Sequence, residues 1–128
     1  MYKRQAHARI CSLRRRLAET DLALPAEADL SLLDDEELDL VRLAATFPRA
    51  VEAAAAAHEP HRIAFWLGEL AASFHALWNK GNDAPEKRFL MAQNPELTRA
   101  RLELADAIGQ IVRNGLAVMG VTAAEEML

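Results

Sequence analysis

The sequence predicts an all-α fold, a single antiparallel bundle of about five helices. Alanine (26 residues) and leucine (19) are abundant, whereas valine, isoleucine and threonine together supply only 13 residues. This bias favours helix over sheet. Apolar residues also recur at spacings of three and four, which is the period of an amphipathic helix. A length of 128 residues suits one hydrophobic core, so we expect residues 1–128 to form a single domain.

Three helices are predicted in the first half of the chain. The first runs from about Tyr2 to Leu17, and a linker over residues 19–33 follows it. The second begins at Asp34, because Asp34 and Glu37 have the spacing of a capping box, and it ends before Phe47-Pro48. A short alanine-rich helix, Arg49–Ala57, comes next.

Two long helices are predicted in the second half. Pro60 opens one of them, because proline fits the first turn of a helix, and a loop over residues 80–94 follows it. Asn94 as N-cap and Pro95 at the first helical position open the other, which ends near Gly120. The core is expected to centre on apolar residues of these two helices: Trp66, Leu70, Phe74, Ile108, Ile111 and Leu116.

Charge is unevenly distributed although the net value is only −4. Residues 1–16 contain six basic residues and no acid, whereas residues 19–39 contain nine acids and no base. The basic end is either a phosphate-facing surface or an ordinary solvated helix end, and charge alone does not separate the two.

The chain lacks the signature motifs of most enzyme classes. There is no glycine-rich phosphate loop, no nucleophile elbow and no Cys-x-x-Cys pair. The pairs His7 with Cys11 and His58 with His61 have helical ligand spacing, but two pairs make a metal site only if they converge, so we expect no metal. We therefore expect no catalytic activity from this chain alone.

The lone cysteine, Cys11, has no partner for a disulfide within the chain, which indicates a reducing, cytoplasmic setting. The apolar runs are far shorter than the roughly 20 residues of a membrane span, so no membrane contact is expected. Trp66 and Phe74 are assigned to the core, whereas Trp78, near a helix end, is either core or a stacking platform. One flank of the same helix has a mixed stripe that a plain core helix does not need: His61, Phe65, Gly68, His75 and Asn79.

Four blocks resemble, in order, the anticodon-binding domain of arginyl-tRNA synthetases. The first is Gln5-Ala-His-Ala-Arg-Ile-Cys-Ser12. The others are Phe47-Pro48 with Val51-Glu52, the stretch from Glu59 to His75 with Trp78-Asn79, and Asn114-Gly-Leu116 with Met119-Gly-Val121. The family's C-terminal module, often called the DALR domain, is a helical bundle, which agrees with the independent prediction from composition and period.

The resemblance implies a function in tRNA recognition. The chain would be the C-terminal fragment of a larger bacterial synthetase, and it would hold the anticodon stem-loop of tRNA(Arg) while a catalytic domain, absent here, uses ATP and Mg²⁺ to attach arginine. No cofactor is implied for this chain, and no DNA. The family's anticodon contacts correspond here to Tyr2, His7, Arg9, Trp78, Asn79 and Met127. Gln5 departs from the pattern, because the family usually has tyrosine there, and Trp78 replaces a common tyrosine.

Two other hypotheses remain open at this point. The related helical domain of the glycyl-tRNA synthetase β-subunit is one, and the Ala-His-Ala-Arg block disfavours it. The other is a helical interaction module that docks a partner helix through the flank from Phe65 to Asn79. Salt separates RNA binding from helix docking, because contacts to phosphate weaken steeply as salt rises.

Overall fold

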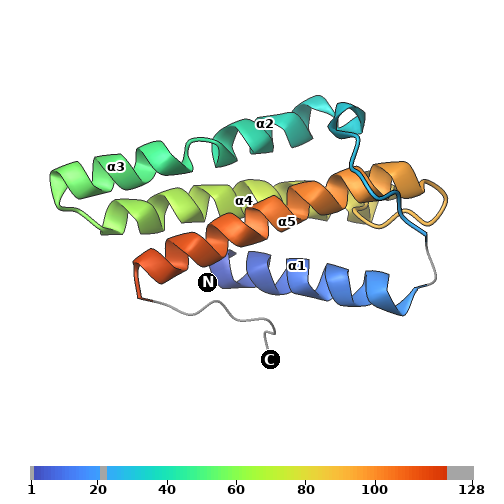
Figure 1. The fold of residues 1–128 in the computed structure, drawn as a ribbon, viewed down its shortest axis with the longest axis horizontal. Helices are drawn as coiled ribbons and strands as arrows, with labels where there is room; N and C mark the ends of the chain where they lie inside the picture. Colours follow the sequence, from blue (N-terminus) through green and yellow to red (C-terminus); the bar gives the residue numbers. More distant parts are fainter. Residues whose placement is uncertain (1, 21–22, 121–128) are drawn as a thin grey trace.

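The computed structural model describes residues 2–20 and 23–120, and over these ranges the chain is helical and has no strand. Five α-helices account for most of it (Figure 1): α1 (Tyr2–Glu19), α2 (Asp35–Ala44), α3 (Phe47–Ala57), α4 (His61–Asp83) and α5 (Pro95–Val118). Two short 3-10 helices, η1 (Leu30–Leu32) and η2 (Pro85–Lys87), lie in the connections. The predicted all-α class and helix number are confirmed.

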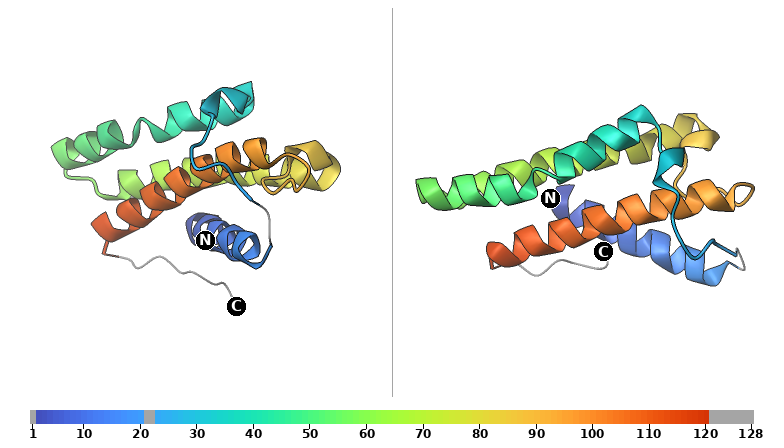
Figure 2. Two further views of the ribbon diagram at one scale, coloured as in Figure 1. Left: turned by 45° about the vertical axis from the view of Figure 1, so that its right-hand side comes forward. Right: turned by 45° about the horizontal axis from the view of Figure 1, so that its top comes forward.

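α4 lies at the centre of the bundle and packs against each of the other four α-helices. α2 and α3 follow one another along one side of it, and α1 lies on the other side, beside α5 (Figures 1 and 2). α4 is antiparallel to α2, α3 and α5, as predicted. α1, however, runs in the same direction as α4, because α2 and α3 both run in the opposite direction and together make a single antiparallel pass between them.

The helix starts agree with the predicted caps. The Asp34 side chain accepts from the Glu37 N–H at 2.8 Å, and the Glu37 carboxylate accepts from the Asp34 N–H at 3.0 Å, which completes a capping box. The Asn94 side chain accepts from the Leu97 N–H at 3.2 Å and caps α5. These ends are set by side chains three residues apart, so the local sequence suffices to predict them.

Three boundaries differ from the prediction by two residues or more. α1 ends at Glu19, two residues past the predicted end at Leu17. α3 begins at Phe47, two residues before Arg49, because Pro48 lies in its first turn, where no N–H donor is needed. α4 extends to Asp83, past the predicted loop start at residue 80. Tertiary contact stabilises this last turn, since Arg88 folds back against Gly81, where a Cβ atom would lie 2.9 Å from the Arg88 Cγ atom.

The core is formed by the inward faces of the helices. Leu70, Phe74, Ile108 and Leu116 are buried as predicted, whereas Trp66 and Ile111 are half-buried at its margin. Trp66 is displaced outward because its indole N–H donates to the Thr46 hydroxyl, 3.0 Å away, at the junction of α2 and α3. Within the described ranges, no helix is long and apolar enough to cross a membrane.

Candidate nucleic-acid interface

Arg9 is the centre of a polar and aromatic cluster between α1 and α4. Its Nη1 atom donates to Nδ1 of His75 at 2.9 Å and to Oδ1 of Asn79 at 3.4 Å. The Arg9 guanidinium carbon also lies 5.8 Å from the ring centroid of Trp78, within cation–π range. Three residues that are far from Arg9 in sequence therefore hold one cationic group in place.

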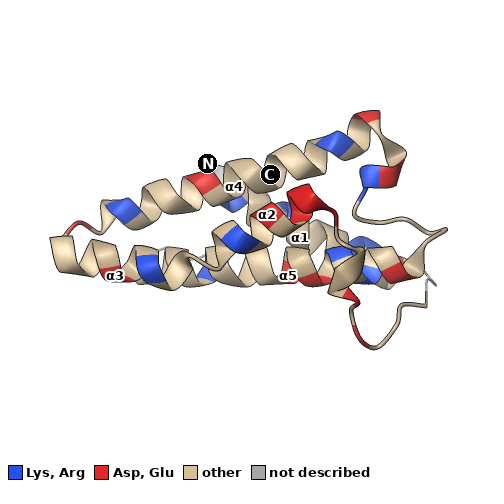
Figure 3. Cartoon of the chain, turned by 90° about the horizontal axis from the view of Figure 1, so that it is seen from above, with Lys and Arg blue, Asp and Glu red and all other residues tan. Residues whose placement is uncertain are grey.

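Helix geometry explains why these partners converge. Residues 75 and 79 are one turn apart on α4, and residue 78 lies beside them, so a single side chain from α1 can reach all three. The stretch of α4 from residue 70 to 79 contains no charged residue (Figure 3). Among the described residues Arg9 has no carboxylate partner, so its charge stays available to an anionic ligand.

Trp78 is half-buried, and its ring is the aromatic surface on which the Arg9 guanidinium lies. Its ring lies 5.9 Å from that of Phe74 and 5.4 Å from that of Phe89, centroid to centroid. Phe89 is buried and comes from the connection between α4 and α5. Trp78 thus lies partly in the core and partly at the surface, and its use as a stacking platform stays a prediction.

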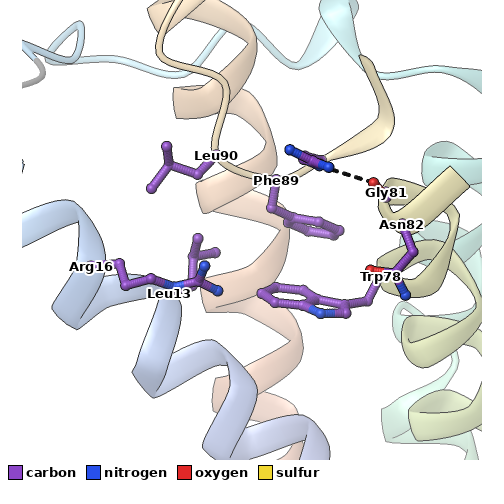
Figure 4. Close-up of a pocket in the computed structure, with 8 residues that line it drawn as sticks. Leu13, Arg16, Trp78, Gly81, Asn82, Phe89 and Leu90 are labelled. Carbon is purple, nitrogen blue, oxygen red and sulfur yellow. Dashed lines mark hydrogen bonds between the residues drawn. The ribbon is translucent and has the colours of Figure 1, made fainter. Parts of the chain in front are cut away.

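A hollow of about 250 Å³ opens beside Trp78, between α1, the end of α4 and the α4–α5 connection (Figure 4). Its wall includes two arginines, one amide and two leucines in addition to the aromatic rings: Leu13, Arg16, Trp78, Gly81, Asn82, Arg88, Phe89 and Leu90. Cationic groups at an aromatic hollow are typical of sites for unstacked bases and phosphates.

The wall of the hollow is held by hydrogen bonds that the sequence does not predict. Arg88 Nε donates to the Gly81 carbonyl at 2.9 Å. Arg101, on α5, donates from Nη1 to the carbonyls of Glu86 and Arg88 at 2.9 and 2.6 Å. These bonds fix the connection that places Phe89 on Trp78. No local motif marks them, since each joins residues from different elements.

His7 lies apart from the Arg9 cluster. It is buried, and its Nε2 atom accepts from Nη1 of Arg113 at 3.1 Å. Its Nδ1 atom is 3.8 Å from the sulfur of Cys11. His7 and Arg9, two residues apart on one helix, therefore point to different neighbours, His7 toward α5 and Arg9 toward α4.

The remaining predicted site residues are placed only in part. Tyr2 begins α1, but its side chain lies outside the described part of the structure, and so does the whole of Met127. No group of three or more histidine, cysteine or acidic side chains that could hold a metal occurs among the residues described.

The basic residues of α1 have different surroundings. Arg14 pairs with Asp106 of α5, whereas Arg16 lines the hollow. The acidic start of α2 is neutralised elsewhere, because Glu36 pairs with Lys80 and Asp34 with Lys87. Among the basic residues of α1 in the described part of the chain, Arg16 is therefore the one that lines the Trp78 hollow.

The chain is similar to known proteins over nearly its whole length. A family model described as the DALR anticodon binding domain matches residues 4–127. An arginine–tRNA ligase from Novosphingobium aromaticivorans is 60% identical over 126 residues, which cover 98% of this chain and 22% of that protein. The corresponding ligase of Rhodospirillum rubrum is 52% identical over 134 residues and is covered to 23%.

A solved structure, the Thermus thermophilus arginyl-tRNA synthetase, has the same arrangement of helices. The TM-score is 0.77 at 30% identity, and the match covers 98% of this chain and 21% of that one. The chain thus spans about a fifth of the length of the relatives it matches.

Proposed function

This chain belongs to the DALR anticodon binding domain family, and on that premise we propose that it holds the anticodon stem-loop of tRNA(Arg). The observation that supports this most directly is the Arg9 guanidinium held over Trp78 by uncharged partners. A cation without a carboxylate partner, beside an aromatic ring, can bind a phosphate or a base edge while the ring contacts an unstacked base.

The proposed binding residues divide by position. Arg9, Trp78 and Asn79 form the contact surface, together with the Arg16 side of the hollow. His7 supports this surface indirectly. Its buried ring accepts a hydrogen bond from Arg113 and so couples α1 to α5. Tyr2 and Met127 complete the proposed set on the strength of the resemblance.

We further propose that the chain is the C-terminal part of an arginine–tRNA ligase. The relatives are more than four times as long as this chain, which matches only their anticodon-binding portion. In such a ligase the catalytic domain would use ATP and Mg²⁺ to attach arginine, and the present domain would supply binding energy and orientation. Because its proposed ligand is tRNA, we propose that the protein acts in the cytoplasm.

A salt titration tests the proposal. Binding of the 128-residue chain to an arginine anticodon stem-loop is measured by fluorescence anisotropy at increasing KCl, beside a loop whose middle anticodon base is changed. We expect tighter binding to the arginine loop and an affinity that falls steeply with salt, because phosphate contacts release counterions. Equal affinity for both loops, or a salt-independent contact, contradicts the proposed function.

A further inference from the structure

We propose that His75 is a positioning residue, which fixes the Arg9 guanidinium in the orientation that receives RNA. The inference deepens the proposed function and rests on it, because it assigns Arg9 to the RNA contact. His75 is not among the residues that the family resemblance assigns to the anticodon, and the proposed role is to act through Arg9 rather than to touch RNA.

The hydrogen-bond chemistry defines the state of the His75 ring. Arginine has donors and no acceptor, so Nδ1 of His75, 2.9 Å from the Arg9 Nη1 atom, must present its lone pair. The ring is therefore neutral with its hydrogen on Nε2. His75 is the closer of the two acceptors that Arg9 has on α4, since the contact from Arg9 to Asn79 is 3.4 Å long.

The surroundings of His75 make it a rigid acceptor. Its ring is buried, and it packs edge-on against Phe74, with centroids 5.8 Å apart at an angle of 60°. Phe74 is itself fully buried in the core. A ring held in this way cannot follow the arginine, so the arginine adopts the position that the ring dictates.

The benefit of such an anchor is pre-organisation. An exposed arginine loses much rotamer freedom when it binds a ligand, and part of that cost is met in advance if the side chain is already ordered. Among the described residues both acceptors engage the same nitrogen, Nη1, so Nη2 and Nε keep donors for a phosphate or a base edge.

A pair of substitutions separates positioning from packing. His75→Asn retains an acceptor near the place of Nδ1, whereas His75→Leu fills similar space without one. Affinity for the arginine anticodon stem-loop is measured for both variants of the 128-residue chain, alone and combined with Arg9→Ala, after circular dichroism confirms that each one folds. We expect His75→Leu to weaken binding about ten-fold, as for the loss of a hydrogen bond to a charged group, and His75→Asn to remain within about two-fold of the parent chain.

The double-mutant cycle decides whether the effect passes through Arg9. We expect His75→Leu to add nothing in the Arg9→Ala background, because the two residues act as one unit. Equal losses for the asparagine and leucine variants, an unchanged affinity for His75→Leu, or a full additional loss in the Arg9→Ala background overturns the proposal.

A measurement without RNA keeps the two proposals distinguishable. The ¹⁵N chemical shifts of the His75 ring at neutral pH report which nitrogen is protonated, and we expect an unprotonated Nδ1 that shifts when Arg9 is replaced by alanine. A protonated Nδ1, or no response to Arg9→Ala, overturns the positioning role even if the chain binds RNA. Failure to bind RNA together with the expected shifts contradicts the proposed function and leaves the Arg9–His75 anchor established as a structural pair only, which also overturns its assignment to RNA binding.

Discussion

Arg101 and Glu37 form an ion pair inside the bundle, with the Arg101 Nε atom 2.8 Å from the Glu37 carboxylate and both side chains at most 5% exposed. The pair joins α5 to the start of α2. The same guanidinium donates to the carbonyls of Glu86 and Arg88, so one buried cation ties two helices to the connection behind Trp78. The Nε and Nη1 atoms of Arg101 therefore both donate to an acceptor inside the fold, as a buried charge requires.

Removing one member of this pair should be costly. We expect Arg101→Met to destabilise the fold by about 3 to 5 kcal/mol, because it leaves the Glu37 carboxylate buried without its partner. Urea unfolding followed by circular dichroism measures the change. Combining Arg101→Met with Glu37→Leu should recover part of the loss, and a single variant as stable as the parent chain would show that water replaces the arginine.

Two glycines in the helices predict opposite outcomes for the same substitution. At Gly115 on α5 a Cβ atom would lie 2.6 Å from Cδ1 of Leu67, so Gly115→Ala should destabilise by about 1 to 3 kcal/mol through overpacking. At Gly68 on α4 nothing lies within 4 Å of the added atom, so Gly68→Ala should stabilise by up to about 1 kcal/mol through helix propensity. Thermal unfolding of both variants checks the pair, and a gain at Gly115 would contradict the close approach of α4 and α5.

Acid should weaken the cap of α2. Partial burial raises the pKa of the Asp34 carboxyl, but the hydrogen bond from Lys87, the Glu37 N–H and the charge of Lys87 outweigh it, so this pKa lies below its ordinary value of 3.8. The folded state therefore favours the carboxylate, and its contribution is present above the ordinary pKa and is lost as pH falls through the folded one.

Asp34→Asn isolates this effect, because asparagine keeps a capping acceptor without the charge. The free energy of unfolding should differ between the two chains by less than about 1 kcal/mol at neutral pH, since the pair is partly exposed. The gap should close as pH falls below the ordinary value of 3.8 and then through the lower pKa of the folded state. Lys87→Met should behave in the same way, and a gap that persists in acid would place its origin in the cap alone.

Whether the sequence predicts an interaction depends on how far apart its two residues lie in the chain. Asp34 and Asn94 were predicted as caps because their partners lie three residues away, and the mixed stripe on α4 already contained His75 and Asn79. The contact between Arg9 and His75 spans 66 positions, and that between Arg101 and Glu37 spans 64. No rule based on residue spacing predicts contacts between residues this far apart in sequence. The resemblance supplied Arg9 and Trp78 as site residues, but only the structure shows which groups hold them.

The last prediction concerns the contact surface itself. Arg9→Ala should weaken binding to the arginine anticodon stem-loop about ten-fold or more, and Arg9→Lys nearly as much, because lysine lacks the forked donors that reach His75, Asn79 and a ligand together. Trp78→Leu, which keeps apolar bulk beside Phe89, should lose the roughly 1 to 3 kcal/mol that stacking of one base contributes, whereas Trp78→Tyr should retain most of it.

The matched control is a basic residue on another face of the bundle. Lys87 and Arg88 are unsuitable controls, because Lys87 pairs with the cap residue Asp34 and Arg88 anchors the wall of the hollow. Arg42 on α2 is exposed and pairs with its neighbour Asp39, so Arg42→Ala should change affinity only slightly and equally for both loops. If the Arg9 and Trp78 variants fold and bind like the Arg42 variant, with the preference between loops unchanged, the RNA surface lies elsewhere on the bundle.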